Sequence, residues 1–152
     1  MAVFLSSFVN RIDKKGRVSV PASFRAVLGA EAPGIVVFRS LQHEALDGCS
    51  IAHLELLSRS LEKLDLATET YELIETTIFG GSVQVPFDSE GRITLPAHLA
   101  SAVGIAEDVA FVGRRTTFQI WNPTKFAAHE ESARTAARGG TASKLLLNLP
   151  VR

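Results

Sequence analysis

The feature that most constrains this chain is an internal repeat. Residues 13–22 read Asp-Lys-Lys-Gly-Arg-Val-Ser-Val-Pro-Ala, and residues 88–97 read Asp-Ser-Glu-Gly-Arg-Ile-Thr-Leu-Pro-Ala. Five residue types are identical in the two copies, and the three residues between Arg and Pro are chemically similar. The flanks agree as well, since Leu28-Gly29 matches Val103-Gly104. A repeat of this kind predicts two copies of one supersecondary unit.

Each copy predicts the order strand, strand, helix, strand, strand. The turn between the first two strands begins with Asp, which bonds its own backbone, and has a fourth residue Gly, which adopts positive φ without strain. A short strand then ends at a proline, which suits the first turn of a helix, and the helix stops at a glycine. In the first copy the predicted strands are 7–12, 17–20, 35–39 and 49–52, with a helix over 21–28. In the second copy they are 82–87, 92–95, 109–113 and 117–121, with a helix over 96–103.

A longer helix is predicted after each copy. An apolar stripe at helical spacing is formed by Leu54, Leu57, Leu61 and Leu64. Packing on the local core and a subunit interface are both open interpretations of this stripe. A second helical piece is predicted over 69–76, and Asn122-Pro123 is typical of the start of a helix, here extending to about residue 136. From residue 137 the composition is typical of a flexible tail.

One such unit, of about 45 residues, is too small to bury its own core comfortably. Two copies in one chain can share a core if their hairpins interleave. We therefore expect an α+β fold with pseudo-two-fold symmetry and one composite domain. The predicted boundaries are a first half-domain over 7–54, a helical connector over 55–78, a second half-domain over 79–124, and a C-terminal helix with a flexible tail over 125–152.

The distribution of charge points to a local anionic partner. The chain carries 16 Lys and Arg against 16 Asp and Glu, and zero net charge alone argues against binding to duplex phosphates. Residues 1–30, however, carry five bases against one acid, whereas residues 31–79 carry three bases against nine acids. Such asymmetry is more informative than the total. The first copy of the repeat is therefore the expected anion-binding end.

The turn of the first copy predicts a basic hairpin tip that binds double-stranded DNA. Arg17 can donate two hydrogen bonds to guanine O6 and N7, and Lys14 and Lys15 can contact phosphates. A two-stranded ribbon fits the major groove. The structural alternative is that Asp13 and Arg17 pair merely to hold the hairpin. Residues predicted to shape the two turns are Asp13, Gly16, Asp88 and Gly91.

The remaining candidate DNA-binding residues are Arg11, Arg25 and Arg92. Arg11 and Arg25 extend the basic segment and can flank the groove, with solvated surface as the alternative for both. Arg92 takes the place of Arg17 in the second copy, but the carboxylates of Asp88 and Glu90 beside it oppose a phosphate field. Arg114-Arg115 is expected at a solvated hairpin turn.

Several classes of protein are not indicated. Cys49 is the only cysteine, so an internal disulfide is impossible, a thiolate zinc site is not expected, and a reducing cytoplasm fits. The four histidines are scattered, and we predict neither a metal nor a cofactor. No secretory signal and no run of about 18 apolar residues is found, so no membrane span is expected. No nucleophile motif or phosphate-binding loop is present, so we do not expect an enzyme.

The two motifs together resemble the MraZ family of transcriptional regulators. The resemblance lies in residues 8–21, Phe-Val-Asn-Arg-Ile-Asp-Lys-Lys-Gly-Arg-Val-Ser-Val-Pro, and in residues 87–96, and it covers roughly residues 4–136. It implies two SpoVT-AbrB-type half-domains that form a swapped-hairpin pseudo-barrel, and ring-like homo-oligomers. It also implies binding to short repeated DNA boxes upstream of the division and cell-wall gene cluster, in the nucleoid-associated cytoplasm. Because Ser89 and Glu90 replace the two lysines of the first motif, equal DNA binding by both motifs is an open point.

Two other functions remain open. The same fold can serve as a protein–protein assembly module with incidental DNA binding, which the zero net charge and the acidic middle favour. A toxin-neutralising antitoxin also uses this half-domain, but usually as a single copy, so the fused duplicate argues against that function.

Overall fold

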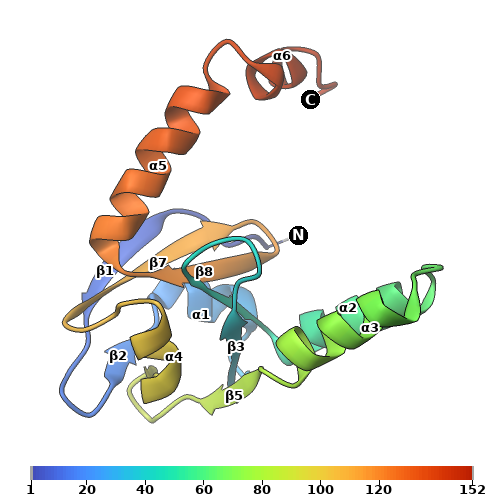
Figure 1. Ribbon diagram of the computed structural model, residues 1–152. Coiled ribbons are helices and arrows are strands. Elements are labelled where there is room, and N and C mark those ends of the chain that lie inside the picture. Colours follow the sequence, from blue (N-terminus) through green and yellow to red (C-terminus); the bar gives the residue numbers. More distant parts are fainter. Residues whose placement is uncertain (1, 152) are drawn as a thin grey trace. The chain divides into compact units, whose positions relative to one another are not determined.

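The computed structural model describes residues 2–151 and divides the chain into two compact units, one up to Asn122 and one from Pro123 (Figure 1). The first unit contains β1 (Ser7–Arg11), β2 (Arg17–Ser19), α1 (Ala22–Leu28), β3 (Gly34–Arg39), β4 (Leu46–Cys49), α2 (Ile51–Glu62), α3 (Thr68–Ile74), the π-helix η1 (Glu75–Phe79), β5 (Val83–Pro86), β6 (Arg92–Thr94), α4 (Ala97–Ala102), β7 (Asp108–Arg114) and β8 (Thr117–Trp121). The second unit contains α5 (Pro123–Ala137) and α6 (Thr141–Leu147). Within residues 2–151, none of the helices has the length and apolarity that crossing a membrane requires.

Strand pairing joins the two copies of the repeat. Six strands form a sheet in the order β1-β7-β8-β4-β3-β5, and β2 and β6 form a separate two-stranded ribbon. All neighbouring strands are antiparallel, and four pairs join a strand of the first copy to one of the second: β1 with β7, β3 with β5, β4 with β8, and β2 with β6. The predicted α+β class is confirmed, and the antiparallel strand pairs are distributed over both copies.

The main core is built by the six-stranded sheet, the ribbon and the helices α1 and α4. Phe24 of α1 is fully buried, and its ring lies 5.3–6.3 Å, between ring centroids, from those of Phe4, Phe8, Phe111 and Phe118. The ribbon contributes Val18 and Ile93, each 1% exposed. Because side chains alternate along a strand, burying these two leaves the other face of the ribbon to solvent.

A second apolar cluster holds the helical connector against the sheet. It contains Val36, Phe38, Cys49 and Leu54, with Leu57, Ile78 and Phe79 packed against them. The leucine stripe of α2 is therefore divided, because Leu54 and Leu57 pack locally whereas Leu64 remains 52% exposed. Beyond this cluster α2 and α3 run side by side (Figure 1), and the Tyr71 hydroxyl donates to the Leu61 carbonyl at 3.0 Å.

Three predicted elements differ from the structure. The strand predicted over 49–52 is wrong, because the Ser50 hydroxyl accepts a hydrogen bond from the His53 N–H at 3.0 Å and begins a helix there, so β4 ends at Cys49. The helix predicted over 69–76 is α3, which continues into η1. The segment predicted as a flexible tail contains α6, which begins after Gly139 has taken a φ of +65°.

We expect Phe24→Ala to lower the free energy of unfolding by about 3–5 kcal/mol, since it removes the ring around which the other aromatic rings pack. Urea denaturation followed by circular dichroism measures this change. Leu41→Ala is the matched control, because Leu41 is 59% exposed and its loss should cost no more than about 0.5 kcal/mol. Equal losses in the two variants would contradict the position of the core.

Candidate nucleic-acid interface

One carboxylate organises the first loop, Asp13–Arg17. Asp13 Oδ1 accepts hydrogen bonds from the backbone N–H of Lys15 at 3.0 Å and of Arg17 at 2.8 Å. Asp13 Oδ2 accepts from Nε of Arg17 at 2.7 Å. The N–H of Gly16 donates to the Asp13 carbonyl, and Gly16 has a φ of +85°, which L side chains rarely adopt. Asp13 and Gly16 thus set the shape of the loop that carries the predicted DNA-binding residues.

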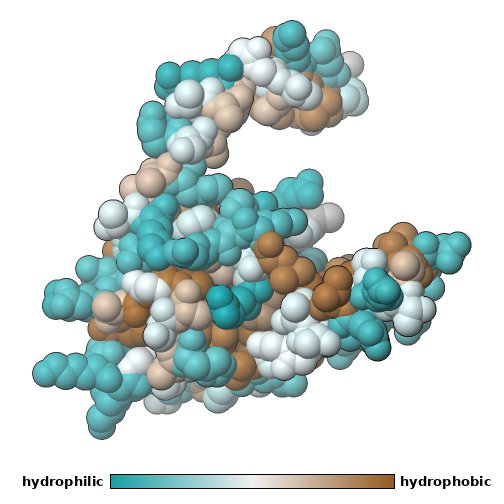
Figure 2. All heavy atoms as spheres, in the orientation of Figure 1, coloured by the Kyte–Doolittle hydropathy of each residue, from teal (hydrophilic) through white to brown (hydrophobic). Residues whose placement is uncertain are grey.

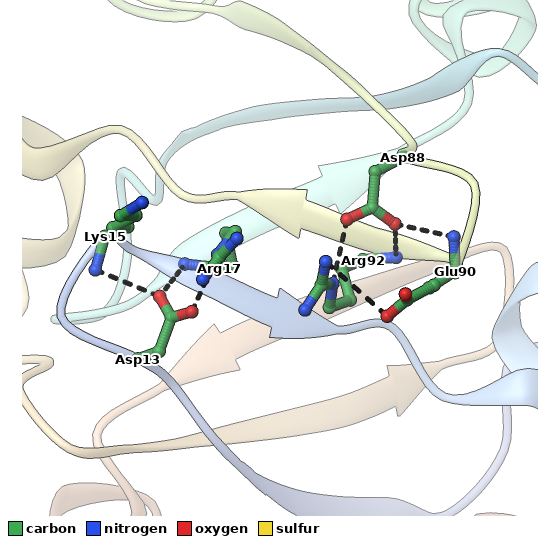
Figure 3. Close-up of polar contacts among 6 residues, drawn as sticks. All are labelled: Asp13, Lys15, Arg17, Asp88, Glu90 and Arg92. Atoms are coloured by element: carbon green, nitrogen blue, oxygen red, sulfur yellow. Dashed lines mark hydrogen bonds and ion pairs between the residues drawn. The ribbon is translucent and has the colours of Figure 1, made fainter.

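The second loop, Asp88–Arg92, repeats this geometry with one difference (Figure 3). Asp88 Oδ1 accepts from the backbone N–H of Glu90 at 2.8 Å and of Arg92 at 2.9 Å, and Oδ2 accepts from Arg92 Nε at 2.8 Å. Gly91 has a φ of +75°. The difference is Glu90, whose Oε2 lies 3.5 Å from Nη2 of Arg92, at the position that Lys15 has in the first loop. Arg92 is therefore held by two carboxylates.

The ribbon of β2 and β6 fixes the positions of the two loops relative to each other. Arg17 pairs with Thr94, Val18 with Ile93, and Ser19 with Arg92. The loops also exchange backbone hydrogen bonds, since the Gly16 carbonyl accepts from the Leu95 N–H at 2.8 Å and the Gly91 carbonyl from the Val20 N–H at 3.2 Å. With Val18 and Ile93 turned into the core, the outer face of the ribbon carries Arg17, Ser19, Arg92 and Thr94.

The first loop offers more cations to a partner than the second. Lys14 and Lys15 are exposed, and the Arg17 side chain is 38% exposed. Because Nε of Arg17 is the atom bound to Asp13, its two terminal nitrogens lie outside that pair and can donate to another group. Figure 2 shows hydrophilic side chains projecting at the lower left, where Figure 1 places the loop between β1 and β2. A cationic, outward-facing tip of this kind suits an anionic partner.

The other sequence-predicted cations lie in three different places. Arg11 is exposed at the end of β1, where Asp108 of β7 is its partner in the backbone register of the two strands. Arg25 is half-buried, and its Nε donates to the Val20 carbonyl at 3.2 Å. A Cβ on Gly91 would lie 2.7 Å from the Arg25 guanidinium, so Arg25 lies directly against the second loop. Arg114 is the last residue of β7 and Arg115 follows it in the turn to β8, and both are exposed, as expected.

Ser19 and Thr94 belong to the same outer face, although the sequence reasoning did not single them out as site residues. The signal that finds them is the alternation of side chains, because each is next to a buried Val18 or Ile93 in its strand. Their hydroxyls can both donate and accept hydrogen bonds. The outer face therefore combines two guanidinium groups with two small hydroxyl groups.

A metal ion or a reactive thiol is not indicated at these loops. Among the described residues, no three His, Cys, Asp or Glu side chains lie close enough to hold a metal ion. Burial raises the pKa of the Cys49 thiol to about 12, with the charge of Asp47 adding to the effect. The chemistry of the loops is thus that of charged hydrogen-bonding groups.

Hydrogen bonds from the backbone N–H of Arg17 lower the pKa of Asp13 below its ordinary value, and the Arg17 guanidinium adds to this effect. Asp88 has a lowered pKa for the same reason, with Arg92 as its partner. Both carboxylates therefore stay ionised, and hold their loops, into the acid range.

We expect Asp13→Asn to cost stability above about pH 4 and progressively less below it. A carboxyl whose pKa is lower in the folded state stabilises the fold above its unfolded pKa, and this stabilisation is lost as the pH falls through the folded value. Urea denaturation of the two proteins from about pH 6 down to about pH 2 measures the difference, with Asp88→Asn as the matched variant. A difference that does not change with pH would contradict an ionised clamp.

Comparison with known proteins places the chain in a family. The sequence model of the family described as "MraZ protein, putative antitoxin-like" matches residues 78–147. The "Transcriptional regulator MraZ" of Rickettsia bellii (strain OSU 85-389) is 48% identical over 139 residues, which cover 90% of this chain and 93% of that protein. The proteins of the same name from Rickettsia akari and Rickettsia canadensis are each 45% identical over 138 residues, with the same coverage. With this identity over nine-tenths of its length, the chain belongs to the MraZ family, a non-enzymatic family named for transcriptional regulation.

Proposed function

We propose that this protein is a transcriptional regulator that binds specific sequences of double-stranded DNA through the first loop and the outer face of the ribbon. The observation that carries the proposal is the cationic tip, in which Lys14 and Lys15 are exposed and Arg17 is held by Asp13 with its terminal nitrogens outside that pair. Membership of a family of transcriptional regulators supports DNA as the partner.

The ribbon enters the major groove with its outer face toward the bases. Arg17 donates from both terminal nitrogens to guanine O6 and N7, a contact worth about 1–3 kcal/mol of discrimination against a wrong base. Asp13 orients the guanidinium through Nε and so reduces the entropy that Arg17 loses on binding.

Lys14 and Lys15 contact phosphates and fix the register, and Arg11 flanks them. Arg92 has a smaller part because Glu90 competes for it.

The half-domains that carry the loops are, in this proposal, two tandem SpoVT-AbrB-type units, 7–54 and 79–124, joined by the connector 55–78. Their hairpins are swapped into one pseudo-symmetric barrel, with residues 125–152 as a C-terminal extension. The four strand pairs that join the copies, and the reciprocal hydrogen bonds of Gly16 and Gly91, support this arrangement.

Several copies act together as a ring-like homo-oligomer on short repeated boxes. The three cations of the first loop, with Arg11 beside them, make few phosphate contacts, so one subunit binds weakly and with strong salt dependence. Linking such sites adds about 10²–10⁴ in avidity when the boxes match the subunit spacing. The proposed targets are boxes upstream of the division and cell-wall gene cluster, and the proposed location is the cytoplasm, in association with the nucleoid.

The second candidate is a protein–protein assembly module. It is favoured by the exposed leucines of the acidic connector, since Leu56, Leu64 and Leu73 are each more than half exposed. Electrophoretic shifts of promoter DNA and of a scrambled duplex, at two salt concentrations, separate the two functions, because an assembly module would bind both duplexes alike. Footprinting on the DNA upstream of the protein's own gene then locates the boxes.

We expect Arg17→Ala to abolish specific binding without unfolding the protein, because it removes the bidentate donor and leaves the core intact. Fluorescence anisotropy with promoter DNA measures the affinity, and circular dichroism checks the fold. Arg17→Lys is the control that keeps the charge but not the two parallel donors, so it should retain non-specific binding and lose the preference for the promoter. Unchanged affinity in Arg17→Ala would remove Arg17 from the interface.

Binding should also collapse when the spacing between two boxes is changed by half a helical turn, about five base pairs. The second box would then face away from the second subunit, and the avidity would be lost. Restoring the phase by inserting a full turn of about ten base pairs should recover most of the affinity. Affinity that is the same at all three spacings would contradict docking by several copies.

A further inference from the structure

The two loops have the same backbone geometry but opposite charge. The first loop carries Lys14, Lys15 and Arg17 against one acid, whereas the second carries Arg92 against Asp88 and Glu90. Even when Arg25 is counted, whose guanidinium lies against Gly91, the second loop is only neutral. A loop of this charge gains little from phosphates, which dominate non-specific binding to DNA.

Glu90 is the residue that makes the difference at the arginine itself. Its Oε2 lies 3.5 Å from Nη2 of Arg92, while Asp88 binds the Nε. Both carboxylates help to raise the pKa of Arg92 above its ordinary value, the Asp88 hydrogen bond most of all. In the first loop Lys15 takes the position of Glu90, so no carboxylate at that position competes for the terminal nitrogens of Arg17.

We infer that Glu90 is a specificity-determining residue that keeps Arg92 from binding phosphates and releases it only to a matching base pair. This inference rests on the proposed function and concerns the second loop alone. The Glu90 side chain is 69% exposed, and an exposed ion pair is weak enough to be displaced. A guanine offers two aligned acceptors and carries no net charge, so it can take the place of the Glu90 carboxylate at Arg92. A phosphate brings a negative charge next to Glu90 and Asp88 and is repelled by them.

Glu90 therefore acts by discriminating against the wrong partner, since specificity is a difference between two affinities. On a non-matching duplex the second loop contributes nothing, and the first loop holds the DNA alone. On a matching box both Arg17 and Arg92 donate to bases, from opposite ends of the same ribbon face. The pseudo-symmetric ribbon thus has one loop that contacts both phosphates and bases and one that contacts bases alone.

The test is Glu90→Gln, titrated against promoter DNA and against a scrambled duplex of the same length. We expect affinity for the scrambled duplex to rise about fivefold, which corresponds to about 1 kcal/mol, and affinity for the promoter to rise less. The slope of log affinity against log salt on the scrambled duplex should become steeper by about 0.9, the value for one added phosphate contact. Glu55→Gln on α2 is the matched control, because it makes the same change of charge on the connector.

The second variant removes the arginine as well. In an Arg92→Ala background, Glu90→Gln should no longer change the ratio of the two affinities, because the residue acts through Arg92. A ratio that still changes, or a Glu90→Gln protein that matches Glu55→Gln on both duplexes, would overturn the inference. Wild-type protein that fails to prefer the promoter would instead overturn the proposed function, so the two failures are distinguishable.

Discussion

The carboxylate of each loop aspartate stabilises the loop in which the chain leaves the six-stranded sheet and enters the two-stranded ribbon. β1 pairs with β7 in the six-stranded sheet, yet β2, only a few residues later, pairs with β6 in the ribbon. The chain changes partner within the loop, and Asp13 stabilises that change by accepting from two backbone N–H groups and from the guanidinium of Arg17. Hydrogen bonds to an ionised group are stronger than neutral ones. Asp88 fixes the same change between β5 and β6.

The ribbon depends on both copies of the repeat at once. Each of its strands has three residues, and an isolated pair of strands is marginally stable in water. It is held because Val18 and Ile93 are buried opposite one another, in the same core cluster as Phe24. Each loop glycine also accepts a backbone hydrogen bond from the other copy, so each loop is tied to the backbone of its counterpart. This coupling gives a physical reason for the two copies to remain in one chain.

The sequence predicts the local parts of this arrangement well and the long-range parts poorly. The turns are predictable because Asp and Gly act within five residues, and β8 was predicted at Thr117–Trp121, as found. The end of β4 was missed because one Ser50 hydroxyl decides between strand and helix. The contact of Arg25 with Gly91 joins residues far apart in the sequence, and no periodicity carries that information. The repeat predicted a shared core, but not which strands of the first copy pair with which strands of the second.

Zero net charge is compatible with a DNA-binding surface because charge acts locally. At about 0.1 M salt, exposed charges more than about 10 Å apart are largely screened from one another. Figure 1 places the acidic α2 and α3 at the opposite side of the first unit from the loop between β1 and β2, so DNA bound at that loop, as proposed, would meet mainly Lys14, Lys15 and Arg17. A loop with few cations binds any single site weakly, and weak single sites favour selection by base contacts and by several copies over binding to DNA of any sequence. In the proposed mechanism the second loop, which is at most neutral, follows the same principle within one ribbon, since Glu90 withholds Arg92 from phosphates, which carry no sequence information.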